Sequence, residues 1–151
     1  RITASATPKA RGKIMSLTGE CLCGSIKYRI NGTLRDPRSC HCSRCRKAFS
    51  AQASSYAEVN ADDFVWSQGE ALLTRYETQP GFGLAFCSRC GSTLCGLYQN
   101  DVHGITLGCL NDDPQIEMGY HIFVGSKASW EVIPEGIVTY AEGVPQSGTE
   151  N

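Results

Sequence analysis

Residues 86–91 read Phe86-Cys87-Ser88-Arg89-Cys90-Gly91. Two cysteines three positions apart can bind one tetrahedral zinc ion, and Gly91 permits the tight turn that points backbone N–H groups at the sulfurs. This zinc knuckle supplies two ligands, so a second pair must come from elsewhere in the chain. The candidates are Cys21 with Cys23 and Cys42 with Cys45, and their spacing alone favours neither pair.

Cysteine is concentrated in this chain: nine occur in 151 residues, and eight of them lie in three clusters. The clusters are Cys21 and Cys23; Cys40, Cys42 and Cys45; and Cys87, Cys90 and Cys95. A disulfide framework is disfavoured because the number is odd, no apolar signal segment precedes the first cluster, and near neighbours do not readily bridge each other. Iron–sulfur proteins also use cysteine ligands, but these spacings match no common cluster motif. Zinc is therefore the expected metal.

Length and composition indicate a globular protein. A chain of 151 residues with 41% hydrophobic residues fits one domain. No apolar run approaches the roughly 20 residues that span a bilayer. We expect residues 15–151 to form a single zinc-binding domain in the cytoplasm, without membrane contact. Residues 1–14 are small, polar and basic, and we expect them to be a flexible extension or an expression remnant.

Positive charge is concentrated in the first third of the chain. Residues 1–50 contain 11 of the 14 Lys and Arg residues but only two acidic residues, Glu20 and Asp36. Four of these cations lie near the second cluster: Arg38, Arg44, Arg46 and Lys47. Such a block can be a nucleic-acid footprint, but aromatic residues are not interleaved with it as stacking platforms require. We favour cations that offset the charge of a zinc–thiolate centre, so nucleic acid is not the expected partner.

Short segments of alternating polar and apolar residues predict an all-β fold. The predicted strands cover residues 25–30, 54–59, 64–66, 72–76, 94–98, 104–110, 121–124 and 137–140. Asn31-Gly32 is a strong hairpin-turn signal after the first of these strands. This number of short strands favours a β-sandwich or a β-barrel.

One short helix is predicted over Ser43–Phe49, where Ser43 can cap the N-terminus and the following residues tolerate a helix. A helix here places the thiols of Cys42 and Cys45 at its N-terminal end. Free N–H groups and the helix dipole favour negative charge at that end, so these thiols would ionise more easily.

Three blocks of sequence carry a resemblance to a known family. They are Gly19-Glu20-Cys21-Leu22-Cys23-Gly24, Cys40-His41-Cys42-Ser43-Arg44-Cys45-Arg46-Lys47 and Phe86-Cys87-Ser88-Arg89-Cys90-Gly91. In order and spacing the blocks resemble the glutathione-dependent formaldehyde-activating enzyme family, and the resemblance extends over about residues 19–131. It implies an Mss4-like fold, in which short coiled β-sheets surround zinc, and a relation to centromere protein V.

The resemblance also implies two zinc ions per chain. A structural zinc would be held by Cys21, Cys23, Cys87 and Cys90. A second zinc would be held by Cys40, Cys42 and Cys45, with one coordination position open for a substrate thiolate or water.

The implied activity is that of a zinc-dependent carbon–sulfur lyase acting on an adduct of a thiol and a carbonyl compound. Glutathione would be the co-substrate, adding to formaldehyde to give S-(hydroxymethyl)glutathione. Arg44, Arg46 and Lys47 are candidates to bind the carboxylates of glutathione.

Cys95 leaves two alternatives open. As a fourth sulfur at the second zinc it would close that site, and a closed zinc is normally structural. Otherwise it is a small buried residue in a strand. Two further positions depart from the family pattern: Ser50 stands where a glycine is expected, and Leu84 stands where a basic residue often precedes the knuckle.

The three histidines are not expected to bind zinc. We expect His41 to support the neighbouring ligands or to lie exposed. His121 lies in an apolar strand and is expected to be a hydrogen-bonded core residue. His103 is expected in a turn.

Two other functions are compatible with the cysteines. In a zinc-stabilised binding module both zinc ions are structural, and the basic face contacts nucleic acid or a protein partner. In a redox protein, Cys42 and Cys45 form a reversible disulfide and release one zinc.

Overall fold

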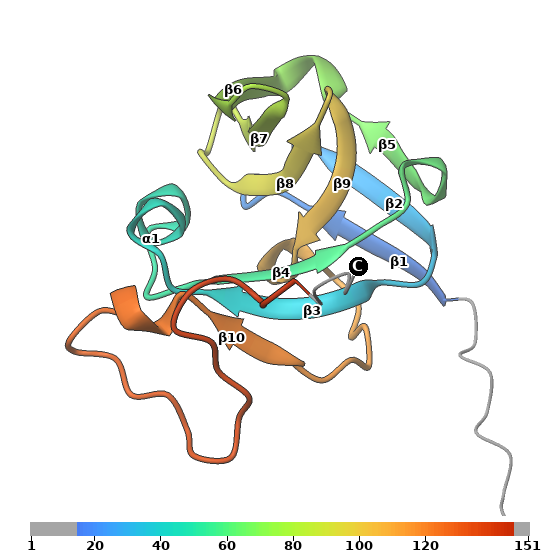
Figure 1. Ribbon diagram of the computed structural model, residues 1–151. Helices are drawn as coiled ribbons and strands as arrows, with labels where there is room; N and C mark the ends of the chain where they lie inside the picture. The colour runs from blue at the N-terminus through green and yellow to red at the C-terminus, as the bar shows by residue number, and fades with distance from the viewer. Residues whose placement is uncertain (1–14, 147–151) are drawn as a thin grey trace, which may run out of the picture.

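The computed structural model describes residues 15–146, so the extension expected over residues 1–14 lies outside the described residues. Within that range the protein is mostly β with one α-helix, as the sequence predicts (Figure 1). The strands are β1 (Met15–Glu20), β2 (Lys27–Gly32), β3 (Arg35–Cys40), β4 (Ser54–Glu58), β5 (Phe64–Gln68), β6 (Leu73–Gln79), β7 (Phe82–Cys87), β8 (Thr93–Tyr98), β9 (Asp101–Thr106) and β10 (Tyr120–Ile122). The helical segments are α1 (Ser43–Phe49) and the short 3-10 turns η1 (Ala61–Asp63), η2 (Glu70–Leu72), η3 (Leu107–Cys109) and η4 (Val124–Ser126).

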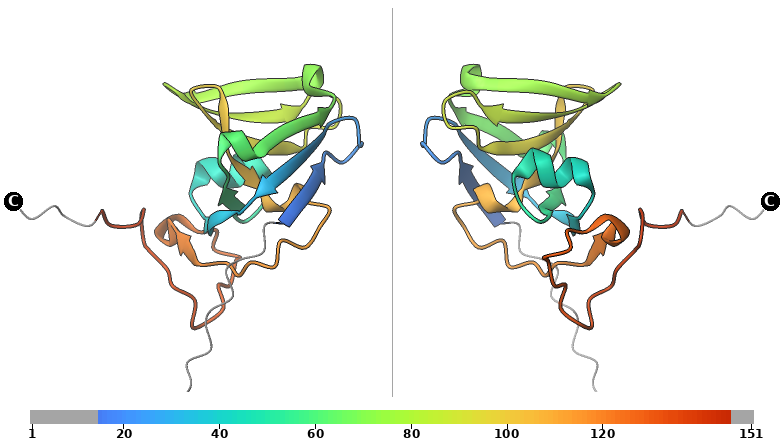
Figure 2. Two further views of the ribbon diagram at one scale, coloured as in Figure 1. Left: turned by 90° about the vertical axis from the view of Figure 1, so that its right-hand side faces the viewer. Right: turned by 90° about the vertical axis from the view of Figure 1, so that its left-hand side faces the viewer.

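The described strands form two sheets (Figures 1 and 2). The small sheet has the order β1-β2-β5, and the large sheet has the order β10-β3-β4-β9-β8-β7-β6. Neighbouring strands are antiparallel except β10, which pairs in parallel with β3. The barrel alternative is therefore wrong, because neither sheet closes on itself. No helix within residues 15–146 has the length and apolar character needed to cross a membrane.

The chain passes from the small sheet to the large one where a hairpin was expected. Asn31 and Gly32 both lie in β2 and pair with β1, while the next strand, β3, belongs to the large sheet. The predicted Asn31-Gly32 turn is wrong because β2 continues through it. Residues 137–140 also differ from the prediction, since they contribute only a bridge between Thr139 and His121.

Three strands were not predicted: β1, β3 and β7. The β3 strand is charged and contains Pro37, and its pairing with β4 is irregular between Arg35 and Arg38. It is a strand because β4 and β10 flank it in the sheet. The strand predicted over residues 104–110 also differs: β9 ends at Thr106, and residues 107–109 form η3.

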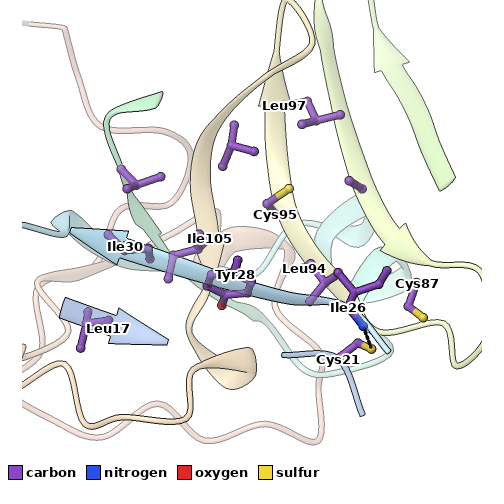
Figure 3. Close-up of a cluster of buried hydrophobic side chains, with 13 residues drawn as sticks. Leu17, Cys21, Ile26, Tyr28, Ile30, Cys87, Leu94, Cys95, Leu97 and Ile105 are labelled. Atoms are coloured by element: carbon purple, nitrogen blue, oxygen red, sulfur yellow. Dashed lines mark hydrogen bonds between the residues drawn. The ribbon is translucent and has the colours of Figure 1, made fainter. Parts of the chain in front are cut away.

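A core of buried side chains joins the two sheets. Tyr28 and Ile30 of β2 cluster with Cys95 and Leu97 of β8 and with Ile105 of β9 (Figure 3). Each large apolar side chain buried in this way contributes about 1.5–3 kcal/mol to stability. The core therefore holds the small sheet against the middle strands of the large one.

Tyr28 determines which residue can lie opposite it on β1. Its ring stacks on Phe64, with 5.1 Å between centroids, and meets Trp66 edge-on at 5.9 Å. Gly19 of β1 pairs with Tyr28, and a Cβ atom at Gly19 would lie only 2.1 Å from Cζ of the ring. Because the ring is buried and packed on two sides, only glycine leaves room for it.

The helix α1 is capped differently from the prediction. Cys42 is the N-cap residue, and its Sγ accepts a hydrogen bond from the Cys45 N–H at 3.3 Å, so Cys42 takes the place expected for Ser43. At the other end, Ser50 has a left-handed conformation with φ of 50°. Glycine adopts this conformation more readily than serine, which fits the glycine expected at this position.

The α1 helix is joined to the large sheet by two side-chain contacts. Arg44 Nη2 donates to the Thr78 carbonyl of β6 at 2.9 Å, and Thr93 Oγ1 of β8 donates to the Ala48 carbonyl at 3.2 Å. In Figures 1 and 2, α1 also lies beside η4, which follows β10. Segments distant in sequence thus contact both ends of the helix.

We predict that Gly19→Ala lowers the free energy of unfolding by about 1–3 kcal/mol, because overpacking a tight site has a cost of that size. Urea denaturation of the zinc-loaded protein measures this change. Gly108→Ala is the matched control, since a Cβ atom there meets nothing within 4 Å. The control is expected to remain within about 0.5 kcal/mol of the wild type. Equal stability of the two variants would contradict the packing account.

Candidate metal centres

The four cysteines Cys21, Cys23, Cys87 and Cys90, called here the first cysteine group, lie together. All four sulfurs are within 4.8 Å of one another. The distance between Cys21 Sγ and Cys23 Sγ is 3.6 Å, and that between Cys23 Sγ and Cys87 Sγ is 3.9 Å. Sulfurs bound to one tetrahedral zinc lie roughly 3.8 Å apart, given a zinc–sulfur bond of about 2.3 Å. The donor set and its spacing therefore fit zinc.

Two turns bring these sulfurs together. In one turn, which follows β1, the Gly24 N–H donates to the Cys21 carbonyl at 2.9 Å. In the other, which follows β7, the Gly91 N–H donates to the Cys87 carbonyl at 2.8 Å. Gly91 has a φ of 77°, in the left-handed region expected from the knuckle sequence. Figure 3 shows Cys21 and Cys87 next to each other at the edge of the core.

Hydrogen bonds to sulfur differ within the first cysteine group. Burial raises the pKa of Cys21 to about 11, although its sulfur accepts a hydrogen bond from the Ile26 N–H at 3.3 Å. The side chain and backbone of Ser92 hydrogen-bond to the Cys90 sulfur and lower the pKa of that thiol to about 5. Ser92 also accepts from the Leu22 N–H at 2.9 Å, so it ties the two turns together.

A second cysteine group consists of Cys40, Cys42 and Cys45. Cys40 ends β3, Cys42 caps α1 and Cys45 lies in its first turn, and the three sulfurs are within 4.8 Å of one another. Among residues 15–146, no fourth Cys, His, Asp or Glu side chain joins this group. All three residues are half-buried. The group therefore offers three thiolate donors, a set that suits zinc with one position left open.

In the second cysteine group, the thiols of Cys40 and Cys45 differ in pKa. A hydrogen bond from the Cys45 thiol lowers the pKa of Cys40 to about 6, and hydrogen bonds from the backbone and side chain of Cys42 act in the same direction. As the donor to Cys40, and because it is half-buried, Cys45 has a raised pKa, contrary to the easier ionisation expected at the start of α1. Cys40 thus ionises more readily than Cys45.

Cys95 lies in the core and belongs to neither group. It is 0% exposed on β8, where its neighbours across the sheet are Ala85 and Ile105. Burial raises the pKa of its thiol to about 12, which disfavours the thiolate that binds metal. Of the two alternatives for Cys95, the structure therefore agrees with the small buried residue in a strand.

The cations near the second cysteine group have different surroundings. Arg38 pairs with Asp36 at 2.6 Å and with Glu58 at 3.3 Å, so its charge is already compensated. Lys47 is exposed on α1. Arg46 is half-buried, and its Nε atom is buried without a hydrogen-bond partner among the described residues. Of these cations, Arg46 has the clearest unused donor.

A hollow of about 420 Å³ lies between the C-terminal half of α1, β4 and the knuckle. Ala48 and Phe49 of the helix line it, together with Ser92 and Thr93. Ala48 and Phe49 follow Cys45 by about one helical turn, or roughly 5.4 Å along the axis. Cys90 and Cys109 also line the hollow, whereas the second cysteine group lies about one helical turn away from it.

The surroundings of the three histidines agree only in part with the predictions from the sequence. His41 is fully buried, so the exposed alternative is wrong. Its Nδ1 lies 2.9 Å from Glu131 Oε2, and its Nε2 lies 2.7 Å from Nδ1 of His121. His121 is hydrogen-bonded as expected but only half-buried, so its predicted place in the core is wrong. His103 lies on β9 rather than in a turn and contacts the Tyr56 hydroxyl at 3.1 Å. Glu131 was not foreseen, because it lies in a polar segment without periodicity.

Comparisons with known proteins show which proteins this chain resembles. A family model described as "Glutathione-dependent formaldehyde-activating enzyme" matches residues 16–126. A protein of Halomonas elongata, described as "Putative glutathione-dependent formaldehyde-activating enzyme", is 30% identical over 128 residues, which cover 77% of this chain and 80% of that protein. A crystal structure of a Rhodobacter sphaeroides protein has a TM-score of 0.51 at 21% identity and covers 82% of this chain and 98% of its own. That structure supports the fold alone.

We predict that two variants of buried cysteines differ in zinc content. Cys87→Ala is expected to bind one zinc fewer and to unfold at lower denaturant concentration, because it removes a donor from the group that joins two distant turns. Cys95→Ala is expected to keep the wild-type zinc content, because Cys95 lies outside both groups. Zinc per chain, measured by elemental analysis after gel filtration, distinguishes them. Loss of zinc from Cys95→Ala would instead make Cys95 a ligand.

Proposed function

Because this chain belongs to the glutathione-dependent formaldehyde-activating enzyme family, we propose that it is a zinc-dependent carbon–sulfur lyase. Its proposed reaction joins glutathione and formaldehyde to give S-(hydroxymethyl)glutathione, and splits that adduct in the reverse direction. The observation that carries this proposal is the second cysteine group, in which three thiols converge without a fourth donor among residues 15–146. An open position distinguishes catalytic zinc from structural zinc.

The two cysteine groups have separate proposed roles. The first cysteine group would hold a structural zinc with four thiolates, and the second would hold a zinc with three. A zinc ion in the second group supplies positive charge and an open position, which favour the thiolate form of an incoming thiol. Two zinc ions per chain, and cysteines kept reduced for them, agree with a place in the cytoplasm.

The proposed reaction needs no oxidant or reductant. The glutathione thiol gives up its proton, and its sulfur forms a bond to the carbonyl carbon of formaldehyde. The electron pair of the carbonyl π bond moves to oxygen, which takes a proton from water. Cleavage of the carbon–sulfur bond reverses each of these changes. The chain must therefore favour a thiolate and hold it in place, rather than transfer electrons.

Arg46 is the best-supported candidate for binding glutathione. Its Nε atom is buried without a partner in the described part of the chain, and the residue lies next to Cys45 on α1. Glutathione carries two carboxylates, which a guanidinium group binds well. The adjoining hollow, with the hydroxyl groups of Ser92 and Thr93, offers donors and acceptors for the peptide groups of the same ligand. The exposed Arg44 and Lys47 are proposed to add positive charge at its rim.

The binding-module alternative has less support. That function needs a closed second zinc, and Cys95 was the fourth sulfur available for closing it. The burial of Cys95 in the core, outside both cysteine groups, argues against such closure.

We predict that the protein accelerates adduct formation from glutathione and formaldehyde and that Cys42→Ser lowers this acceleration by roughly 100-fold or more. Charge stabilisation by a metal ion contributes several kcal/mol, and each 1.4 kcal/mol is about tenfold in rate. Exchange NMR on the two substrates, compared with the uncatalysed rate, measures the effect. Cys95→Ala is the control, because Cys95 lies in the core, outside both cysteine groups. No acceleration by wild-type protein would rule out this activity.

We also predict that Arg46→Gln raises the KM for glutathione by about tenfold and leaves kcat nearly unchanged. A hydrogen bond to a charged group contributes about 1.5 kcal/mol, and a contact present throughout the reaction affects binding alone. Arg29→Gln serves as the control, since Arg29 is exposed on β2 of the small sheet. Equal KM values for the two variants would show that Arg46 does not contact glutathione.

A further inference from the structure

The His41 ring is held on two sides, although it lies between two members of the second cysteine group. The residue is 0% exposed. Its Nδ1 lies 2.9 Å from Glu131 Oε2, and its Nε2 lies 2.7 Å from His121 Nδ1. The two imidazole rings lie edge to edge, with 5.0 Å between centroids and 23° between their planes. Since both ring nitrogens have partners, the ring has one favoured orientation.

Both partners of His41 are themselves fixed by the C-terminal segment. The His121 N–H donates to the Val138 carbonyl at 2.9 Å, and the His121 carbonyl accepts from the Tyr140 N–H at 2.8 Å. Lys127 Nζ donates to the Glu131 carbonyl at 2.9 Å, which stabilises the turn that carries the carboxylate. Glu131 and His121 therefore form a prearranged clamp for the ring.

The backbone around His41 transmits this restraint to the cysteines. The His41 N–H donates to the Ile122 carbonyl at 3.0 Å, which extends the pairing of β10 with the end of β3. Cys42, which follows, also has an extended conformation, with φ of −64° and ψ of 154°. Successive side chains of an extended chain point to opposite sides, so Cys40 and Cys42 project away from the side on which His41 is buried.

We propose that Glu131 and His121 are positioning residues for the second cysteine group and act through His41. The inference rests on the proposed function in one respect, since it takes that group to bind zinc. His41 is not counted as a ligand: it anchors the backbone from which two ligands project. In zinc proteins, replacing residues that orient the ligands costs about 10–100-fold in metal affinity.

The hydrogen-bond chain defines where one proton lies. An ionised carboxylate only accepts hydrogen bonds, so the proton between Glu131 and His41 is carried by His41 Nδ1. The remaining proton of the chain lies between His41 Nε2 and His121 Nδ1. A protonated Nδ1 on His41 is therefore a signature of the clamp that does not depend on catalysis.

The first test measures zinc affinity by competition with a chromophoric chelator. Glu131→Ala and His121→Ala are expected to weaken the second zinc by about 10–100-fold and to leave the first unchanged. Retention of the first zinc also shows that a variant has folded. Glu131→Gln keeps an oxygen that can accept from His41 Nδ1, so it is expected to stay within about threefold of wild type. Glu135→Ala, which removes an exposed carboxylate from the same segment, is the control.

The second test uses long-range ¹H–¹⁵N NMR on the wild-type, zinc-loaded protein to locate the proton on His41. We expect a protonated Nδ1 that exchanges slowly with solvent, and faster exchange in Glu131→Ala. A His41 with a bare Nδ1 would overturn the proposed clamp, whatever the variants do.

The outcomes separate this inference from the proposed function. Two tightly bound zinc ions in both wild type and Glu131→Ala would overturn the positioning role and leave the proposed function standing. Selective weakening of the second zinc, in a protein that does not accelerate the glutathione reaction, would support the positioning role and overturn the proposed activity. A wild-type chain that binds only one zinc would overturn both.

Discussion

The first cysteine group joins the two sheets of the protein, and the rest of the structure depends on that junction. Cys21 and Cys23 follow β1 of the small sheet, whereas Cys87 and Cys90 lie at the end of β7 of the large sheet. Cys23 and Cys87 are 64 residues apart in sequence, yet their sulfurs are 3.9 Å apart. Binding of a structural zinc contributes about 10–16 kcal/mol, as much as the whole stability of an ordinary domain. The proposed structural zinc would therefore reinforce the core that joins the same two sheets.

The second cysteine group is built differently, and the difference suits a different role. Its three residues lie within six positions of one another and are brought together by local structure, the end of β3 and the first turn of α1. It crosslinks no distant segments, so its half-buried thiols are available for chemistry. Distant residues contribute instead from outside the group: the clamp on His41 comes from the C-terminal segment, and the hollow beside α1 is closed by the knuckle.

The sequence predicts the local features of this protein better than those that depend on distant contacts. The bounds of α1 follow from helix tolerance within Ser43–Phe49, but the cap differs because the Cys42 sulfur accepts the hydrogen bond expected for the Ser43 hydroxyl. The β3 strand could not be foreseen, because its charged, proline-containing sequence is extended only through pairing with β4 and β10. Spacing alone could not pair the knuckle with Cys21 and Cys23, and it took the family resemblance to favour them. Nothing in the local sequence links Glu131 to His41, 90 residues away.

The central claim is that one cysteine group forms a closed zinc site and the other an open one. X-ray absorption at the zinc K-edge tests it most directly, because it counts the sulfur atoms around zinc. In protein loaded with two zinc ions, sites with four and three thiolates predict an average of about 3.5 sulfur ligands per zinc, with a lighter atom completing the second site. Addition of glutathione should raise the average to about four. An average of four sulfurs before glutathione is added would contradict the open site and, with it, the proposed chemistry.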